Sequence, residues 1–203
     1  MQPLFTIWFS PRKTFRYLID HYDPISVWLL AVLAGIKECF NWASTFGMGE
    51  RHAVDFIGVL IVVVGPLMGA ANWIAAFFTR WVGRKFDGHG TLEGIFAVLV
   101  WSALPVIIIL PYRLLLIFAF GAQAFTPGMA VVASHSGDAG LILLSFGWGL
   151  LQFLSAIWGL ILMLVGISEV QGFTKWNAFA NLCVAGFLTY LIFGLPIYFL
   201  FRL

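Results

Sequence analysis

The chain has 203 residues, of which 62% are hydrophobic and only 10% are charged, and its formal net charge is +2. A soluble core of this size does not consume so much apolar surface, so the composition excludes an ordinary soluble domain and predicts an integral membrane protein. The net charge is too small to indicate a nucleic-acid partner.

The N-terminal segment, residues 1–25, is predicted to contain a helix over residues 11–20 that lies along the membrane surface. Pro11 suits the first helical position because it lacks only an N–H that the first turn leaves unused, and Ser10 precedes it as a cap. We expect the cations of this helix to face anionic lipid phosphates and its apolar side chains to enter the interface. The cations are Arg12, Lys13 and Arg16, and the apolar residues are Phe15, Leu18 and Ile19. A docking site for a cytosolic partner is the alternative.

Residues 26–203 are predicted to form one all-α transmembrane domain. A stretch of about 20 apolar residues crosses the roughly 30 Å of hydrocarbon in a bilayer. The sequence contains five such stretches, at residues 26–46, 54–80, 93–121, 141–168 and 177–201. Prolines inside these stretches predict bent helices, at Pro66, Pro105, Pro111 and Pro196. We therefore expect a polytopic, five-helix transmembrane bundle with an N-terminal interfacial helix.

Basic residues fall mainly on one side of the five predicted spans. That side has Arg12, Lys13, Arg16, Arg80, Arg84, Lys85 and Lys175, whereas the opposite side has only Arg51 and Arg202. Because short loops rich in lysine and arginine stay in the cytoplasm, we expect a multi-pass protein of the cell inner membrane. Its N-terminus is expected in the cytoplasm and its C-terminus outside.

A polar cluster is predicted in the outer half of the membrane. Lys37 and Glu38 are adjacent within the apolar first span, and adjacent residues of a helix point about 100° apart, so each needs its own partner. Arg113 lies as far from the outer end of the third span as Glu38 lies from that of the first, which predicts a Glu38–Arg113 ion pair. Asn41, Asp55 or a water-filled pocket is expected to compensate Lys37. The cluster either orients the helices or lines a path for a substrate or an ion.

A second cluster of charges is expected at the cytoplasmic face, where opposite charges neutralise one another. Its members are Arg84, Lys85, Asp87, Glu93, Glu169 and Lys175. The neighbouring sequence FDGHGTLEG, with Thr91 as a cap, predicts a glycine-rich turn that leads into a helix. It lacks the Gly-Lys-Ser/Thr ending of a phosphate loop. Both loop geometry and a binding role are compatible with this cluster.

Candidate catalytic and metal-binding residues are sparse. Ser134, His135 and Asp138 share one outer loop, but sequence neighbours seldom form a hydrolase triad and no nucleophile elbow accompanies them. His52 with Asp55 and His135 with Asp138 repeat an H-x-x-D spacing, which is a weak indication of a divalent metal site. The sequence therefore predicts no catalytic residue, no metal and no cofactor, and it assigns these side chains to capping and loop polarity.

Four stretches carry a family resemblance, namely IWFSPRKTFRYL, GPLMG, GHGTLEGIFAVLVWSALP and IWGLILMLVGISEVQGFTKWNAFANL. In this order and spacing, which cover nearly the whole chain, they resemble the bacterial branch of the Yip family, the Ypt/Rab-interacting proteins. The resemblance implies five spans with a cytoplasmic N-terminus, and it supplies no catalytic residues. Eukaryotic members have a long cytosolic N-terminal region and act in membrane traffic with Rab-type GTPases, whereas about 25 residues precede the first span predicted here.

Two functions remain open on these observations. A non-enzymatic protein that organises the membrane or partner proteins explains the helical bundle, the basic N-terminal helix and the absence of a catalytic motif. The alternative is a transporter or channel for a small solute, ion or lipid, through a polar path containing Lys37, Glu38 and Arg113. The expected partners are the lipid bilayer, with anionic lipids at the N-terminal helix, and a second copy or another membrane protein. No nucleic acid is expected.

Overall fold

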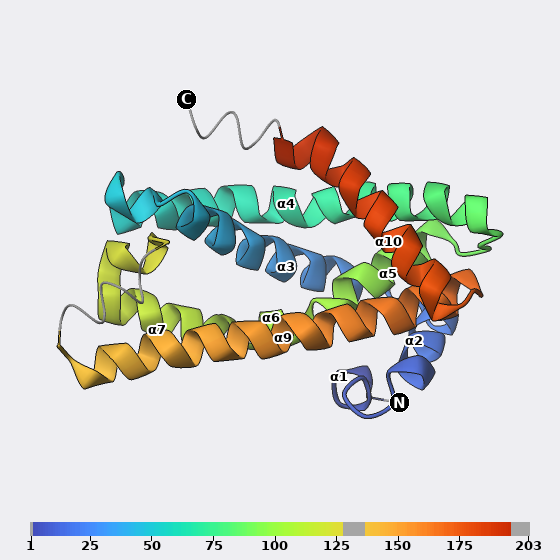
Figure 1. Cartoon of the computed structure of the whole chain (residues 1–203), viewed down its shortest axis with the longest axis horizontal. Coiled ribbons are helices and arrows are strands. Elements are labelled where there is room, and N and C mark those ends of the chain that lie inside the picture. Colours follow the sequence, from blue (N-terminus) through green and yellow to red (C-terminus); the bar gives the residue numbers. More distant parts are fainter. Residues whose placement is uncertain (1, 128–136, 196–203) are drawn as a thin grey trace. The chain divides into compact units, whose positions relative to one another are not determined.

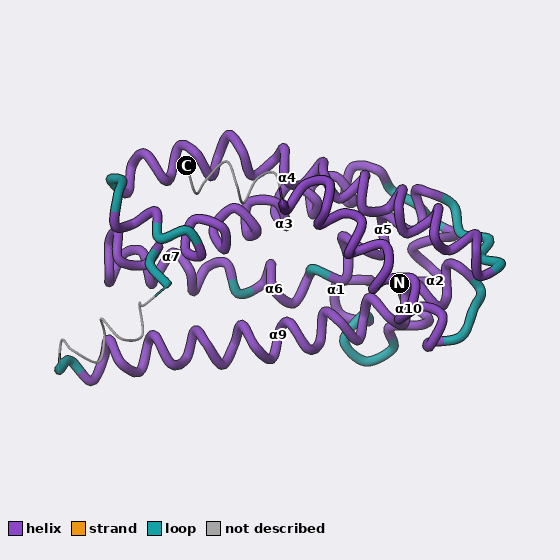
Figure 2. Tube along the Cα trace, turned by 45° about the horizontal axis from the view of Figure 1, so that its top comes forward, coloured by secondary structure: helices purple, strands orange, loops and turns teal. Residues whose placement is uncertain are grey.

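The computed structural model describes residues 2–127 and 137–195, which form helices joined by turns and short loops (Figure 1). Within these two ranges no residue is in a strand, and Figure 2 shows only helices and the loops between them. The all-α fold class predicted from the sequence is therefore confirmed.

Three helices are long and apolar enough to cross a membrane. They are α3 (Pro24–Thr45), α4 (Val54–Gly83) and α9 (Ala139–Gln171). They agree with the first, second and fourth predicted spans, and each is at least about 30 Å long at 1.5 Å per residue. These apolar helices make the chain a multi-pass membrane protein.

The third predicted span is a broken helix, composed of α5 (Leu92–Ser102), α6 (Leu104–Ile108) and α7 (Leu110–Phe120). Its two parts are bent by 42°, so they make a fourth crossing only if they are counted together. Pro105 and Pro111 lie at the interruptions. A proline has no N–H to donate to the carbonyl four residues earlier, which explains why the helix breaks there.

The predicted count of five spans is not reproduced. The fifth predicted span, residues 177–201, corresponds to α10 (Lys175–Thr189) and a single π-helical turn, η4 (Tyr190–Gly194). With 15 residues, α10 taken alone is too short to be counted as a spanning helix. Residues 196–201 of the predicted span lie outside the described residues.

Side chains that cap helix starts explain several element boundaries. Asp23 accepts backbone N–H groups of Ile25 and Ser26 at the start of α3. Hydrogen bonding with Ser26 is the main reason why the pKa of the Asp23 carboxyl lies below its usual value. Thr91 caps α5 by accepting from the backbone N–H of Gly94, as predicted.

The N-terminal residues form two short helices, α1 (Pro3–Thr6) and α2 (Pro11–Asp20). The predicted helix over residues 11–20 is therefore confirmed, with Pro11 in its first turn. The prediction that the Ser10 side chain caps α2 is wrong, because Ser10 uses its backbone instead: its carbonyl accepts from Thr14 and its N–H donates to Thr6. Three short 3₁₀ turns complete the described elements: η1 (Met48–Glu50), η2 (Arg84–Phe86) and η3 (Gly121–Phe125).

The chain divides into two compact units. Unit 1 comprises residues 1–31, 70–103 and 159–203, and unit 2 comprises residues 32–69 and 104–158. The boundaries therefore fall inside α3, α4 and α9 and between α5 and α6. The division predicted from the sequence, at residue 25, stays a prediction.

Unit 1 has an aromatic and aliphatic core. Phe96 is fully buried, and its ring lies 5.0 Å from the ring of Trp28 and 4.9 Å from that of Trp73. Phe15 of α2 is also buried, and a methyl group at Gly166 of α9 would press on its ring. The small residue in α9 thus leaves space for the aromatic side chain of α2.

Unit 2 contains a close crossing of α3 and α4 at three glycines. A methyl group on Gly35 would overlap the carbonyl oxygen of Gly65 and the backbone nitrogen of Gly69. Likewise, a methyl group on Gly65 would lie 2.9 Å from the Cα atom of Ile36. Small residues let two helix backbones approach each other, which is the main source of packing attraction between helices in lipid. This crossing explains the glycine at the start of the GPLMG motif.

Replacing Gly35 by alanine is expected to destabilise the protein by about 1–3 kcal/mol, the usual cost of overpacking. The matched control is Gly58→Ala in α4, where an added methyl group meets nothing within 4 Å. Because alanine is the better helix former, this control should be neutral or stabilising. Unfolding of both variants in mixed micelles, followed by circular dichroism, measures the difference. Equal stability of the two variants would contradict the crossing.

Candidate functional site

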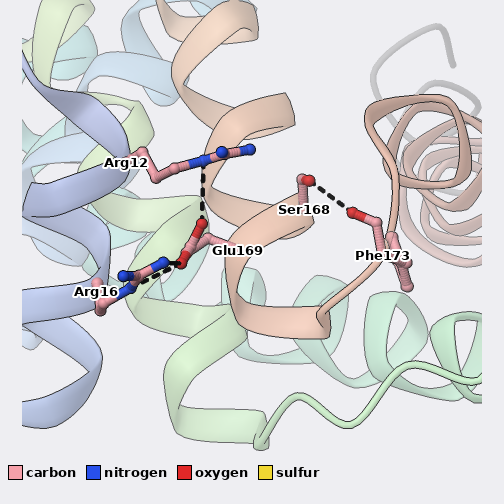
Figure 3. A network of polar contacts seen from close by, with 5 residues as sticks. All are labelled: Arg12, Arg16, Ser168, Glu169 and Phe173. Atoms are coloured by element: carbon pink, nitrogen blue, oxygen red, sulfur yellow. Dashed lines mark hydrogen bonds and ion pairs between the residues drawn. The ribbon is translucent and has the colours of Figure 1, made fainter.

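An ion-pair network ties the N-terminal helix α2 to the end of α9 within unit 1 (Figure 3). The Glu169 carboxylate accepts from Nε of Arg16 at 2.9 Å and lies 3.2 Å from Nε of Arg12. A second nitrogen of Arg16, Nη2, contacts the same carboxylate. The two arginine side chains are 59% and 69% exposed, so solvent screens these pairs and they fix position more than they add stability.

Two of the three apolar residues that were predicted to enter the lipid interface, Phe15 and Leu18, are instead buried inside the protein, whereas Ile19 is half-buried. Phe15 and Leu18 are 1% and 8% exposed, and α2 packs against α5. Arg12 and Arg16 pair with Glu169, but their side chains remain 59% and 69% exposed, so their contact with lipid phosphates stays a prediction. Lys13 is exposed. Hence α2 is a helix docked on the rest of unit 1.

A glutamine holds the glycine-rich loop of unit 1. The Gln171 side chain donates to the carbonyl of Thr79 at 3.2 Å and accepts from the N–H of Gly90 at 3.3 Å. Its backbone carbonyl accepts from the N–H of His89 at 3.2 Å. A side chain at Gly88 would collide with the Gln171 amide. The glycines of FDGHGTLEG therefore give the loop access to Gln171, a residue that the charge pattern alone did not indicate.

Asn181 of α10 lies beside this loop with both amide atoms unpaired among the described residues. The residue is fully buried, and a methyl group on Gly83 would meet both its amide and that of Gln171. An unpaired buried amide is costly, so this polar core is under-satisfied. Sequence reasoning missed Asn181, although an asparagine within an apolar helix is a signal for such a position.

The predicted cytoplasmic-face cluster does not assemble as proposed. Glu169 pairs with Arg12 and Arg16, whereas no ion pair within the described ranges joins the other five residues. Those five are Arg84 and Lys85 in η2, Asp87 with a left-handed backbone (φ 59°), Glu93 in the first turn of α5, and Lys175 at the start of α10. Their places at helix ends and in a turn favour loop geometry as their role.

Glu93 has an electrostatic effect on a tyrosine between α2 and α3. The pKa of the Tyr22 phenol is raised, first by partial burial and then by the negative charges of Glu93 and Asp23. The phenol therefore stays neutral, and Glu93 has no cationic partner in the described part of the chain.

Arg113 of α7 is a buried cation in unit 2, with 4% of its surface exposed. Its Nη2 group donates to the carbonyl of Ala124 at 2.9 Å and to the hydroxyl of Ser44. Three aromatic rings lie with their centroids between 5.3 and 5.9 Å from the guanidinium carbon, namely those of Phe40, Phe125 and Trp148. The rings and a backbone carbonyl thus stabilise the charge in place of a carboxylate. Arg113 links α3, α7 and η3.

Lys37 and Glu38 form a different group, on the surface of α3. The Glu38 carboxylate accepts from the indole Nε1 of Trp42 at 3.0 Å and from Nδ2 of Asn41 at 3.4 Å. Nζ of Lys37 lies 3.4 Å from the same carboxylate. The side chain of Glu38 is 48% exposed and that of Lys37 is 16% exposed. Trp42 was missed, although its position four residues after Glu38 places both on one helix face.

The predicted Glu38–Arg113 ion pair is wrong. The two residues have separate partners, and no ion pair joins them in the described part of the chain. Equal depth does not determine the direction of a side chain around its helix. Arg113 instead reaches a backbone carbonyl of η3. Asp55 begins α4 and has no contact with Lys37 or Glu38 among the described residues.

Only some of the weak catalytic and metal-binding candidates lie among the described residues. Ser134 and His135 lie outside the described residues. Asp138 accepts from the backbone N–H of Gly140 at 2.7 Å and so caps α9. His52 lies against the ring of Phe56, at 4.9 Å between centroids. Residues 2–127 and 137–195 contain no group of three metal-ligating side chains.

Comparison with known proteins identifies one family. The Yip1 domain matches residues 5–195, which is nearly the whole chain. No curated protein and no solved structure matches the chain.

The contacts of Arg113 predict energetic coupling with Ser44 and none with Glu38. Arg113→Gln and Ser44→Ala should each destabilise the protein, and the double variant should lose less than the sum, by about 0.5–3 kcal/mol. In the parallel cycle, Arg113→Gln and Glu38→Gln should be additive within about 0.5 kcal/mol. Thermal unfolding in detergent measures both cycles. Coupling in the second cycle and additivity in the first would restore the predicted ion pair.

Proposed function

Because the chain belongs to the Yip1 domain family, we propose that this multi-pass membrane protein has a non-enzymatic role in which it organises the membrane or partner proteins. The group that contacts partners is Lys37, Glu38, Asn41 and Trp42 on α3, which we call the α3 polar face. Its members lie in an apolar, membrane-spanning helix.

The observation that carries this proposal is the exposure of Glu38. Its side chain is 48% exposed, although α3 is a candidate membrane span. Intramembrane charges normally face protein or a water-filled cavity, because lipid tails cannot solvate them. A second protein surface placed against the α3 polar face supplies such an environment. An interaction surface is therefore the function that this geometry supports best.

The buried charges have structural partners instead. Glu169 positions α2, and Arg113 joins α3 to α7 and η3. The transport alternative requires Lys37, Glu38 and Arg113 to share one path. The separate partners of Glu38 and Arg113 favour the interaction role over such a path.

Photo-crosslinking in cells tests the interaction role. A photoreactive amino acid at Thr45, which is exposed and lies on the same face of α3 as Glu38, should give discrete protein adducts. The matched control is Val63 of α4, which is 60% exposed and should give lipid adducts only. Glu38→Gln should reduce the Thr45 adducts several-fold, because it removes the charge that the partner compensates.

Measurements of ion and solute flux across liposomes test the transport alternative. Purified protein in liposomes is expected to conduct neither small ions nor solutes above the level of empty liposomes. A flux that Glu38→Gln abolishes, together with an absence of protein adducts at Thr45, would reject the interaction role.

We further propose that the chain resides in the inner membrane with its N-terminus in the cytoplasm and its C-terminus outside. The asymmetry of lysine and arginine between the loops supports this orientation. Anionic lipid headgroups are then the proposed partners of Lys13 and of the exposed parts of Arg12 and Arg16.

Labelling of single cysteines tests this orientation in a background that lacks Cys39 and Cys183. Both Arg51 and Lys85 are exposed. An impermeant maleimide added to intact cells should label a cysteine at position 51, and it should label one at position 85 only after lysis. The reverse pattern would invert the topology.

A further inference from the structure

The depth of the α3 polar face follows from the glycine crossing of unit 2. Gly35 is level with the stretch between Gly65 and Gly69. Glu38 lies three residues beyond Gly35, about 4.5 Å along α3 at 1.5 Å per residue, and α4 runs in the opposite direction. Glu38 is therefore level with residues near position 64 of α4.

Apolar side chains of α4 surround this level on both sides. On the outer side, Val59 and Val62 are 65% and 69% exposed, and on the inner side Leu67 is 67% exposed. Phe56, which lies about 12 Å further out along α4 than position 64 at 1.5 Å per residue, is 51% exposed. Such a run of exposed apolar residues belongs in hydrocarbon. Lys37 and Glu38 consequently lie at hydrocarbon depth and not in the headgroup region.

The contacts within one chain leave Lys37 with one partner, whereas the Glu38 carboxylate also accepts from Trp42 and Asn41. Lys37 and Glu38 are neighbours in sequence, so their side chains diverge and their closest atoms remain 3.4 Å apart. An ammonium group has three donors, and this is its one ion pair among the described residues. Glu38, Asn41, Trp42 and Thr45 follow the i, i+3, i+4, i+7 spacing of a single helix face. This face carries donors and acceptors and lies in a membrane span.

We propose that the α3 polar face is covered by the same face of a second copy of this chain, in a symmetric dimer. This inference rests on the proposed interaction role and names its partner. Two copies inserted in the same orientation are related by a two-fold axis along the membrane normal, which keeps each residue at the depth of its counterpart. We place this axis between the two residues, so that Lys37 of one copy faces Glu38 of the other, and the reverse.

Charge neutrality favours a second copy over a different partner. One copy contributes one positive and one negative charge at nearly the same depth, so two copies form two exchanged pairs with no net charge. A partner with a single charge leaves one charge uncompensated in hydrocarbon, which is costly. Asn41 adds a self-complementary amide, since an amide side chain both donates and accepts.

Two charge-reversal variants test the exchange of partners. Lys37→Glu chains carry two negative charges on the face and Glu38→Lys chains carry two positive charges, so each should fail to pair with itself. We expect their self-association in liposomes to weaken by about tenfold or more, and an equimolar mixture to recover to within about threefold of the wild type. Single-molecule photobleaching of labelled chains measures the fraction of dimers. Val63→Gln, at nearly the same depth on α4, is the control and should leave the fraction unchanged.

A second measurement avoids charge reversal altogether. In chains without Cys39 and Cys183, a single cysteine at Thr45 should form an oxidative cross-link between two copies, whereas one at Val63 should not. A wild type that stays monomeric at every protein-to-lipid ratio, or a mixture that associates no better than each variant alone, would overturn the dimer. Thr45 adducts with a different membrane protein, combined with a monomeric wild type, would overturn the dimer but leave the interaction role standing. Monomers without any protein adduct would reject both.

Discussion

A polar side chain inside hydrocarbon must find its partner within protein, because lipid tails offer neither donors nor acceptors. Three polar side chains of the described residues find such partners, each in a different way. Glu169 forms ion pairs with two arginines of α2. Arg113 donates to a hydroxyl and a carbonyl and lies against three aromatic rings. Gln171 hydrogen-bonds to the backbone of a glycine-rich loop. Each solution fixes one part of the chain against another within its unit.

A second requirement of a helical membrane protein is close approach between helix backbones, and glycine residues allow it. Without a hydrophobic driving force between helices, packing in lipid depends on how near two backbones come. Gly35 lies against the backbone at Gly65 and Gly69, and Gly166 gives space to Phe15. At Gly88 a side chain would displace the Gln171 amide. Gly47 has a different purpose, since its φ of 62° ends α3 in a conformation that other residues rarely adopt.

Features encoded by neighbouring residues were predictable from the sequence. The apolar stretches predicted α3, α4 and α9. Pro11 marked the start of α2, and Thr91 marked the cap of α5. The pairing of charges was not predictable, because it depends on the direction of each side chain around its helix. Equal depth in the membrane predicted that Arg113 pairs with Glu38, yet Arg113 donates to the hydroxyl of Ser44 and to the carbonyl of Ala124 in η3. Backbone acceptors of this kind leave no trace in the residue types.

The contrast between Arg113 and Glu38 carries the functional argument. Both are ionisable residues of apolar helices in unit 2, but Arg113 is 4% exposed and Glu38 has a side chain that is 48% exposed. The Arg113 guanidinium is buried, and its Nη2 donates to Ser44 and to Ala124 of the same chain, whereas its Nε has no partner among the described residues. An exposed charge at hydrocarbon depth is complete only when another surface covers it. Within one small unit, Arg113 therefore stabilises the fold, and we propose that Glu38 serves association.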